Sequence, residues 1–249
     1  MSIKINYKTS NFKKPSSNLV FFTDEKFNIN PLKKFIPSTE YSYINDLLKT
    51  SNLKNDLLVF EISSKKKIVL VSIKKNLKTS DIENLGAKFY KRINYGKNSE
   101  YLIITDTIVS KQNNFISYFL HGLKLKSYQF LKYKTKKETR VILLNIFGKN
   151  KPSTQNQLKF ESLEEGTFYT RDLVSEPGNI LHPDEYAKRI AQLRKIGIKV
   201  TVYDKKKLKK MGCGALLGVG QGSVRGSYLV TMEWKGASSK SKPLALVGK

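Results

Sequence analysis

The first 150 residues alternate between short apolar runs and segments with helical periodicity, and this alternation constrains the fold more than any other feature. Apolar runs between polar turns are typical of strands, whereas apolar residues three and four positions apart are typical of helices. The pattern predicts strands at residues 19–23, 57–62, 67–73, 101–105 and 141–147, with helices at 38–50, from 80 and from 114. Such alternation favours a mixed α/β domain.

Local signals predict how several of these elements begin and connect. The strands at 57–62 and 67–73 flank a short polar turn and therefore favour a hairpin. Ser38 is a candidate N-cap for the helix at 38–50. Ser80 and Glu83 have the spacing of a capping box, which predicts the start of the second helix there.

A polar segment at 149–155 indicates a linker between two domains, residues 1–150 and residues 151–249. After it we expect a helix over 158–175, ended by Glu176-Pro177-Gly178-Asn179, and a second helix from Pro183 to Gly197. Strand patterns follow at 198–203 and 228–234, separated by a short basic helix and a glycine-rich stretch that reaches Ser223. This order predicts a parallel or mixed sheet with helical crossovers.

Residues 244–247 form a run of four apolar residues, followed by Gly248 and Lys249. Such a run predicts a strand buried on both faces. Open α/β sheets bind ligands at the carboxyl ends of their strands, so a functional site is expected where this strand ends. Because domains rarely finish on a core strand, we expect the sequence to stop within a domain.

Composition limits the compartment. Cys213 is the only cysteine, the N-terminus has no apolar signal region, and no apolar run approaches the length of a membrane span. These features predict a cytoplasmic protein that does not bind membranes.

The net charge of +26 has two interpretations. Clustered basic residues attract polyanions, so nucleic acid remains a candidate partner. All but six of the 46 basic residues are lysines, however, and they are scattered over the sequence. Because base and phosphate readers favour bidentate arginine, this excess favours compositional bias.

Isolated candidates for chemistry do not form a catalytic set. His121 lies within an apolar helical pattern and is expected to pack, while His182 is expected to open a helix. Cys213 has no nearby histidine to activate it. The segment 218–223 lacks the ending of a phosphate-binding loop and is interpreted as a loop that allows close backbone packing.

Four segments together resemble one known family. They are Thr170-Arg171-Asp172-Leu173-Val174-Ser175-Glu176-Pro177-Gly178-Asn179-Ile180, then Pro183, then Met211-Gly212-Cys213-Gly214-Ala215-Leu216-Leu217-Gly218-Val219-Gly220-Gln221-Gly222-Ser223, then Leu244-Ala245-Leu246-Val247-Gly248-Lys249. In order and spacing they resemble the leucyl (cytosol) aminopeptidase family over residues 157–249. A weaker resemblance at residues 127–135 matches the end of that family's N-terminal domain.

The resemblance implies a macro-like N-terminal α/β domain followed by the incomplete first part of a mixed-sheet α/β peptidase domain. Family members are hexameric exopeptidases that release N-terminal residues from peptides with two divalent metals, such as zinc or manganese. Lys249 matches a metal-ligand lysine of the family and is the only site residue carried over. A lysine amine binds a metal only when deprotonated, so burial and nearby dications must lower its pKa.

The family pattern continues with aspartates, a catalytic lysine and an arginine loop, none of which is in this sequence. We therefore expect the 249-residue chain, truncated at the first metal-ligand lysine, to be inactive alone and to expose an unpaired, aggregation-prone strand at 244–247. Two classes remain open. One is the N-terminal half of a metalloaminopeptidase completed by a separate segment, and the other is a non-catalytic remnant or basic nucleic-acid-binding protein.

Overall fold

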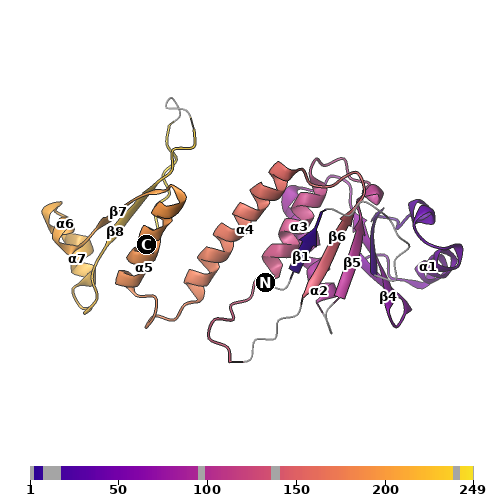
Figure 1. The fold of residues 1–249 in the computed structure, drawn as a ribbon, viewed down its shortest axis with the longest axis horizontal. Helices are drawn as coiled ribbons and strands as arrows, with labels where there is room; N and C mark the ends of the chain where they lie inside the picture. The colour runs from indigo at the N-terminus through magenta and orange to yellow at the C-terminus, as the bar shows by residue number, and fades with distance from the viewer. Residues whose placement is uncertain (1–2, 8–17, 95–98, 136–140, 238–241, 249) are drawn as a thin grey trace. The chain divides into compact units, whose positions relative to one another are not determined.

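The computed structural model describes residues 3–7, 18–94, 99–135, 141–237 and 242–248 (Figure 1). The chain divides into two compact units, Met1–Asp172 (unit 1) and Leu173–Lys249 (unit 2). The division falls inside one helix, α4 (Thr154–Ser175). The domain boundary at residue 150 stays a prediction.

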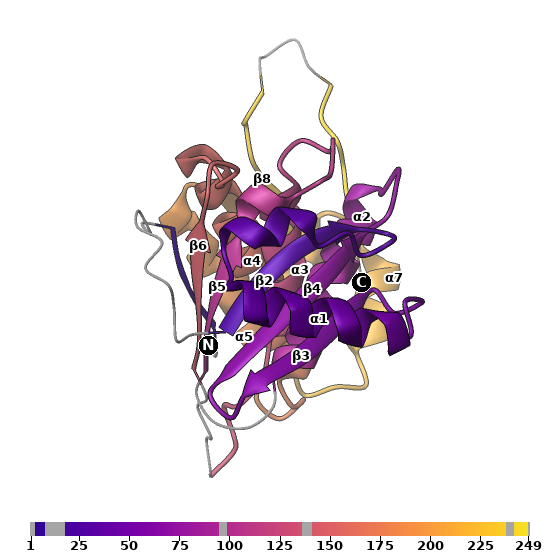
Figure 2. The same cartoon turned by 90° about the vertical axis from the view of Figure 1, so that its right-hand side faces the viewer.

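Unit 1 contains a six-stranded sheet with the order β1-β6-β5-β2-β4-β3 (Figure 2). The strands are β1 (Ile3–Asn6), β2 (Asn18–Asp24), β3 (Leu57–Ser63), β4 (Lys66–Ile73), β5 (Ser99–Ile104) and β6 (Ile142–Phe147). All neighbouring pairs are parallel except β3 and β4, which form the predicted hairpin. The predicted α/β class is confirmed.

Helices cover both faces of this sheet. Successive side chains along a strand point to opposite faces, so a strand with consecutive apolar residues, such as β2, presents apolar side chains to both faces. Leu19 and Phe21 of β2 pack on the side of α1 (Ser38–Thr50). Val20 and Phe22 pack on the side of α2 (Thr79–Ile93) and α3 (Phe115–Lys126). Short 3₁₀ helices at Asn30–Lys34 and Thr105–Thr107 complete the layers. The core of unit 1 therefore has two halves separated by a sheet that is buried on both sides.

Helices α2 and α3 approach each other at two glycines. A Cβ atom on Gly86 would lie 1.9 Å from the carbonyl oxygen of Phe119, and a Cβ on Gly122 would lie 1.9 Å from that of Glu83. Both distances are far below van der Waals contact. The two helix backbones therefore touch, and only glycine fits at either position.

The predicted helix range 38–50 is confirmed, but the predicted caps of two helices are wrong. Helix α1 begins at Ser38, but Pro37 is its N-cap residue and no side chain caps it. Helix α2 begins at Thr79, and the Lys78 backbone N–H donates to Asp81 Oδ2 at 2.9 Å. Because Lys78 is the last extended residue, the capping carboxylate is Asp81 and Glu83 is free for another contact.

Unit 2 is smaller and contains two strands, β7 (Lys199–Tyr203) and β8 (Leu229–Glu233), which pair antiparallel. Between them lie two short helices, α6 (Lys205–Lys210) and α7 (Gly214–Gly220). Before them, α5 (Pro183–Ala191) continues into a 3₁₀ turn, Gln192–Ile196, and ends at Gly197 with φ = 90°. The start at Pro183 and the stop at Gly197 are as predicted. Among the described residues of this unit, the buried apolar ones are few: Ala187, Ile190, Val200 and Leu208.

The structure corrects two predictions in unit 2. The expected loop at 218–223 begins inside α7, and a Cβ on Gly218 would meet nothing within 4 Å, whereas one on Gly220 would lie 2.0 Å from Ser227 Oγ. Residues 244–247 form no strand, and Leu244, Leu246 and Val247 are 87%, 90% and 99% exposed. A strand is buried only when other strands pair with it and other elements cover it. In unit 2 the strands β7 and β8 pair with each other, and neither pairs with residues 244–247.

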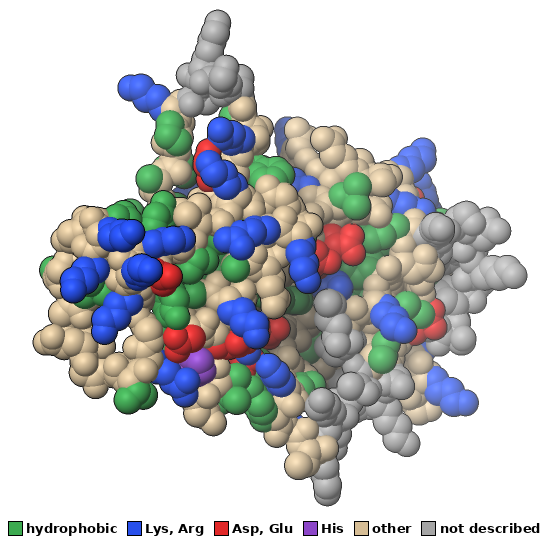
Figure 3. Space-filling model, turned by 60° about the vertical axis from the view of Figure 1, so that its left-hand side comes forward, with side chains coloured by type: hydrophobic (Ala, Val, Ile, Leu, Met, Phe, Trp, Pro, Cys, Tyr) green, Lys and Arg blue, Asp and Glu red, His purple; other side chains and the backbone are tan. Residues whose placement is uncertain are grey.

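Within the described residues, none of the helices combines the length and the apolar character needed to cross a membrane. Lysine and arginine side chains are spread over the face drawn in Figure 3, and acidic side chains are fewer there.

Candidate functional site

The predicted metal-ligand residue, Lys249, lies outside the described residues, so its position stays a prediction. The residues of the family-like motifs in unit 2 are described up to Gly248. Two polar networks join the turn after α4, the first turn of α5 and the segment before β8.

Arg189 organises the first network. Its Nη1 donates to Glu176 Oε1 and its Nε donates to Glu185 Oε1, both at 2.9 Å. The Glu176 side chain is only 2% exposed. The hydrogen bond from Arg189 lowers the pKa of Glu185, and its partners raise the pKa of Arg189. Arg189 therefore fixes the Glu176-Pro177 turn against α5 through a charge-assisted hydrogen bond to a buried carboxylate.

Asp184 organises the second network. The Tyr228 hydroxyl donates to Asp184 Oδ1 at 2.8 Å, and the Gly226 backbone N–H donates to the same oxygen at 3.2 Å. These bonds, the one from Tyr228 first, lower the pKa of Asp184, and the pKa of Tyr228 is raised in turn. His182 is the N-cap residue of α5, as expected for a helix-entry residue, and its Nδ1 lies 3.2 Å from Asp184 Oδ2.

This donor set does not fit two divalent metals. In the described part of the chain, no three His, Cys, Asp or Glu side chains lie together in a group that could hold a metal ion. The carboxylates of Glu176 and Asp184 are already engaged by Arg189 and Tyr228. Hard dications need several free oxygen or imidazole donors, which these engaged carboxylates do not offer.

The free thiol of Cys213 is half-buried at the N-cap of α7. It is in the same unit as His182 but shares no described hydrogen bond with it. That the Cys213 thiol has no histidine to activate it as a nucleophile stays a prediction.

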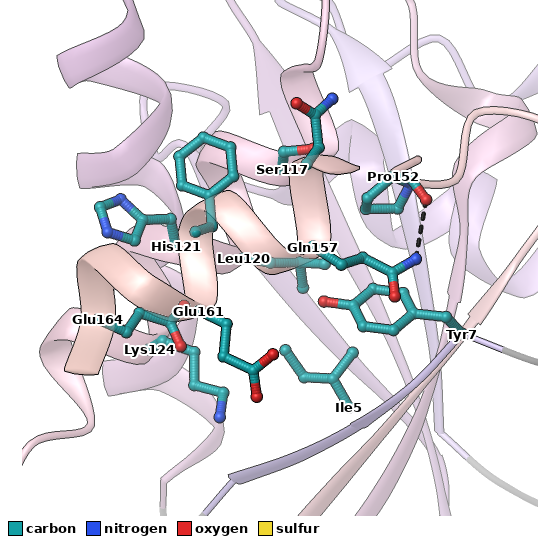
Figure 4. Close-up of a pocket in the computed structure, with 12 residues that line it drawn as sticks. Ile5, Tyr7, Ser117, Leu120, His121, Lys124, Pro152, Gln157, Glu161 and Glu164 are labelled. Atoms are coloured by element: carbon teal, nitrogen blue, oxygen red, sulfur yellow. Dashed lines mark hydrogen bonds between the residues drawn. The ribbon is translucent and has the colours of Figure 1, made fainter. Parts of the chain in front are cut away.

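Unit 1 contains a polar cavity of about 160 Å³ between β1, α3 and α4 (Figure 4). Ile5 and Tyr7 lie on one side, and Gln157 and Glu161 of α4 lie across from them. Burial raises the pKa of Glu164 from 4.5 to about 7, with further contributions from nearby charges. Burial also raises the pKa of Tyr7 to about 12, with the carboxylates of α4 adding to the effect.

His121 also lines this cavity and confirms its predicted packing role. Its ring is buried, with a centroid 4.9 Å from that of Phe160. Sequence reasoning missed its partner: Nδ1 lies 2.8 Å from Glu83 Oε1, across the contact between α2 and α3. The Oγ of Ser117 and the Nε2 of His121 are buried without a partner among the described residues. No local signal pairs residues 38 positions apart, so only the fold reveals this contact.

Comparison with known proteins identifies unit 2 more directly. Residues 168–249 match the family model described as the catalytic domain of the cytosol aminopeptidase family. A probable cytosol aminopeptidase of Brucella ovis is 44% identical over 135 residues, which cover 51% of this chain and 27% of the relative. That of Afipia carboxidovorans is 31% identical over 259 residues, 94% of this chain and 50% of the relative.

Solved structures share the fold. A tomato leucine aminopeptidase mutant matches with a TM-score of 0.74 over 97% of this chain and 52% of that chain, at 18% identity. The bottromycin maturation enzyme BotP in complex with Mn matches with a TM-score of 0.65 over 89% of this chain and 46% of that chain, at 13% identity.

The fold and the motif segments define an α/β protein with the architecture of an aminopeptidase. The chain belongs to the leucyl (cytosol) aminopeptidase family. It spans about half the length of the relative from Afipia carboxidovorans.

Proposed function

We propose that this chain forms the N-terminal half of a two-metal exopeptidase of the leucyl aminopeptidase type, which releases N-terminal amino acids from peptides. The observation that carries the proposal is the match of residues 168–249 to the family's catalytic domain. The proposal divides the chain into a macro-like N-terminal domain, residues 1–150, and the beginning of the peptidase domain, residues 151–249. It also includes a cytoplasmic location and a hexameric assembly.

Two zinc or manganese ions supply the electrophilic and water-activating chemistry of such a site when bound. Manganese is supported by the name of BotP in complex with Mn, a structural neighbour of the chain. Lys249 is the proposed metal ligand contributed by this half. Arg189 and Asp184 serve the site indirectly, because they hold the motif segments of unit 2 in place.

We further propose that the 249-residue chain alone is inactive. One lysine amine does not satisfy two cations, and the networks in unit 2 leave their carboxylates engaged. The proposal is tested by assaying the chain with a leucine-linked chromogenic substrate and manganese, where no turnover above background is expected. Metal-dependent turnover by this chain would contradict it.

A second assay tests the peptidase assignment itself. The chain is produced together with the segment encoded immediately downstream of codon 249. Metal-dependent release of leucine that Lys249→Ala abolishes, while Lys242→Ala leaves it intact, supports the proposal. No release from the combined halves would count against the enzyme assignment.

Nucleic-acid binding by a non-catalytic remnant is the alternative, and the net charge of +26 is the observation in its favour. Charge-driven binding weakens steeply with salt. If binding of double-stranded DNA disappears at physiological salt, the alternative is rejected; if it persists, the alternative is supported.

A further inference from the structure

The parallel strands of unit 1 end at a groove whose lining residues have no assigned role in the proposed function. Two adjoining cavities of about 710 and 750 Å³ share the residues 74–77 that follow β4. The first also contacts residues 24–26, at the carboxyl end of β2, and residues 109–112, which lie beyond β5. The second extends along α2. We call these two cavities together the carboxyl-edge groove.

The groove lies where an open α/β sheet is expected to bind a ligand. From β2 the chain passes through α1 and β3 to β4 on one side of β2, and then through α2 to β5 on the other side. Connections that run to opposite sides of a central strand leave a crevice at its carboxyl end. In unit 1 that crevice is the carboxyl-edge groove.

Lysines dominate the charged groups of the groove. Seven lysines line it, at positions 26, 74, 75, 88, 91, 111 and 126. Two of them share one carboxylate, since Lys74 and Lys88 lie 3.0 Å and 2.5 Å from the Asp56 oxygens. Within the described ranges, the ammonium groups of the remaining five lysines have no hydrogen-bond or ion-pair partner.

The four carboxylates in the groove are already engaged. Asp24 Oδ1 accepts from the backbone N–H groups of Lys26 and Asn28 at 3.1 and 2.9 Å. Glu25 Oε1 accepts from the Lys75 backbone N–H at 2.7 Å, and Asp81 accepts from that of Lys78. With Asp56 held by two lysines, these acids brace the loops and leave an excess of positive charge in the groove.

The distribution of the unpaired lysines indicates the kind of ligand. Lys26 and Lys111 line one cavity, Lys91 and Lys126 line the other, and Lys75 lines both. Lysine ammonium groups bind phosphate as compact point charges. Each cavity has a volume typical of a site for a small molecule. A ligand that neutralises both cavities needs at least two anionic groups.

We propose that the carboxyl-edge groove binds a small molecule carrying two or more linked phosphate groups, spanning the two cavities across Lys75. The proposal uses only residues of unit 1, so its test does not depend on the outcome of the peptidase assays.

Titration calorimetry of the 249-residue chain with tripolyphosphate at about 0.15 M salt tests this proposal. Saturable binding at one site is expected, and it should weaken by about tenfold or more in Lys75→Gln/Lys111→Gln. The matched control, Lys34→Gln/Lys65→Gln, removes the same charge from exposed positions outside the groove and should bind like the parent. Circular dichroism of both variants verifies that the fold is kept.

Three results would overturn the proposal. One is the lack of saturable binding, and another is an equal loss of affinity in the control variant, which would indicate a general charge effect. The third is binding of a short single-stranded oligonucleotide that depends on Lys75 and Lys111 while tripolyphosphate does not bind. Weaker binding of orthophosphate than of tripolyphosphate would support the requirement for linked phosphates.

Discussion

Glu164 lies beside a cavity that favours its neutral form. It faces Lys124 of α3 and Tyr7 after β1, with Glu161 and Glu165 on its own helix, and burial raises its pKa from 4.5 to about 7. A carboxyl group whose pKa is raised in the folded state does not lower the free energy of unfolding at pH values below its unfolded pKa. The cost grows between about pH 4.5 and pH 7 and is complete above that range.

Glu164→Gln should therefore stabilise the protein at about pH 8 by roughly 1 kcal/mol, after allowance for solvent screening of a partly exposed group. At about pH 5 the difference should nearly vanish. Urea unfolding at both pH values measures the effect. Glu165→Gln is the control, because Glu165 is exposed on the same turn. A gain of the same size at both pH values would contradict the prediction.

Arg189 is expected to matter more for stability than its neighbours on α5. Arg189→Ala leaves the Glu176 carboxylate, 2% exposed, without this charged partner. Removing one member of a buried pair costs about 3 kcal/mol. Denaturant unfolding followed in unit 2 should show this loss.

Lys188→Ala is the matched control, since it removes a positive charge from an exposed neighbour and should change stability little. An Arg189→Ala variant as stable as Lys188→Ala would show that Glu176 is satisfied without the guanidinium group.

Residue-level predictions from sequence succeeded where the signal was local. Pro183 begins α5 and Gly197 ends the segment after it, because the proline ring and the left-handed glycine each act on their own backbone. The spacing of Ser80 and Glu83 predicts that Glu83 is a capping residue, yet its carboxylate contacts His121 on the next helix. That contact depends on how two helices pack, which no local pattern contains.

The packing of α2 against α3 is sensitive to side-chain size at Gly86 and Gly122. Gly86→Ala or Gly122→Ala would force the helices apart, because each new Cβ would meet a backbone carbonyl group at 1.9 Å. We expect a loss of about 3 kcal/mol for either change. Thermal or urea unfolding measures it.

Gly166→Ala provides the control, since Gly166 lies within α4 and a Cβ there would meet nothing within 4 Å. Alanine is the better helix former, so this variant should gain up to about 1 kcal/mol. If Gly86→Ala and Gly166→Ala behave alike, the backbone contact between α2 and α3 is not present in solution.

Helices and strands that show a regular apolar pattern of their own could be predicted from the sequence. Strands that form only when a distant segment pairs with them could not. The hairpin of β3 and β4 was predicted because both strands and their turn are contiguous. The run 244–247 has the composition of a core strand, but it lies exposed without a pairing strand. The composition of a segment indicates whether its side chains can be buried. Whether the segment forms a strand depends also on the strands beside it.

The two units differ in how much apolar surface they bury. Unit 1 contains two core clusters built on a six-stranded sheet, whereas the described residues of unit 2 include four buried apolar ones and a two-stranded sheet. Hydrogen exchange follows local unfolding free energies. Amides of β2 and β4 should therefore exchange much more slowly than those of β7 and β8, as exchange measured by mass spectrometry would reveal. Equal protection in both sheets would contradict this prediction.

At the scale of the molecule, the sequence motifs predicted the family, and the comparisons confirmed it. The α/β class was predictable from alternating periodicity. The strand order, with β2 between β4 and β5, was not, because parallel pairing joins residues distant in sequence. The carboxyl-edge groove follows from that order and was therefore invisible in the sequence.

Cys213 is the only cysteine of the chain and Trp234 the only tryptophan, and both belong to unit 2. A maleimide dye on the half-buried thiol would therefore label unit 2 alone, without any engineered mutation. Tyrosine absorbance, by contrast, reports mainly on unit 1. One unmodified sequence thus carries separate spectroscopic reporters, so that the order in which the two units melt can be measured in a single sample.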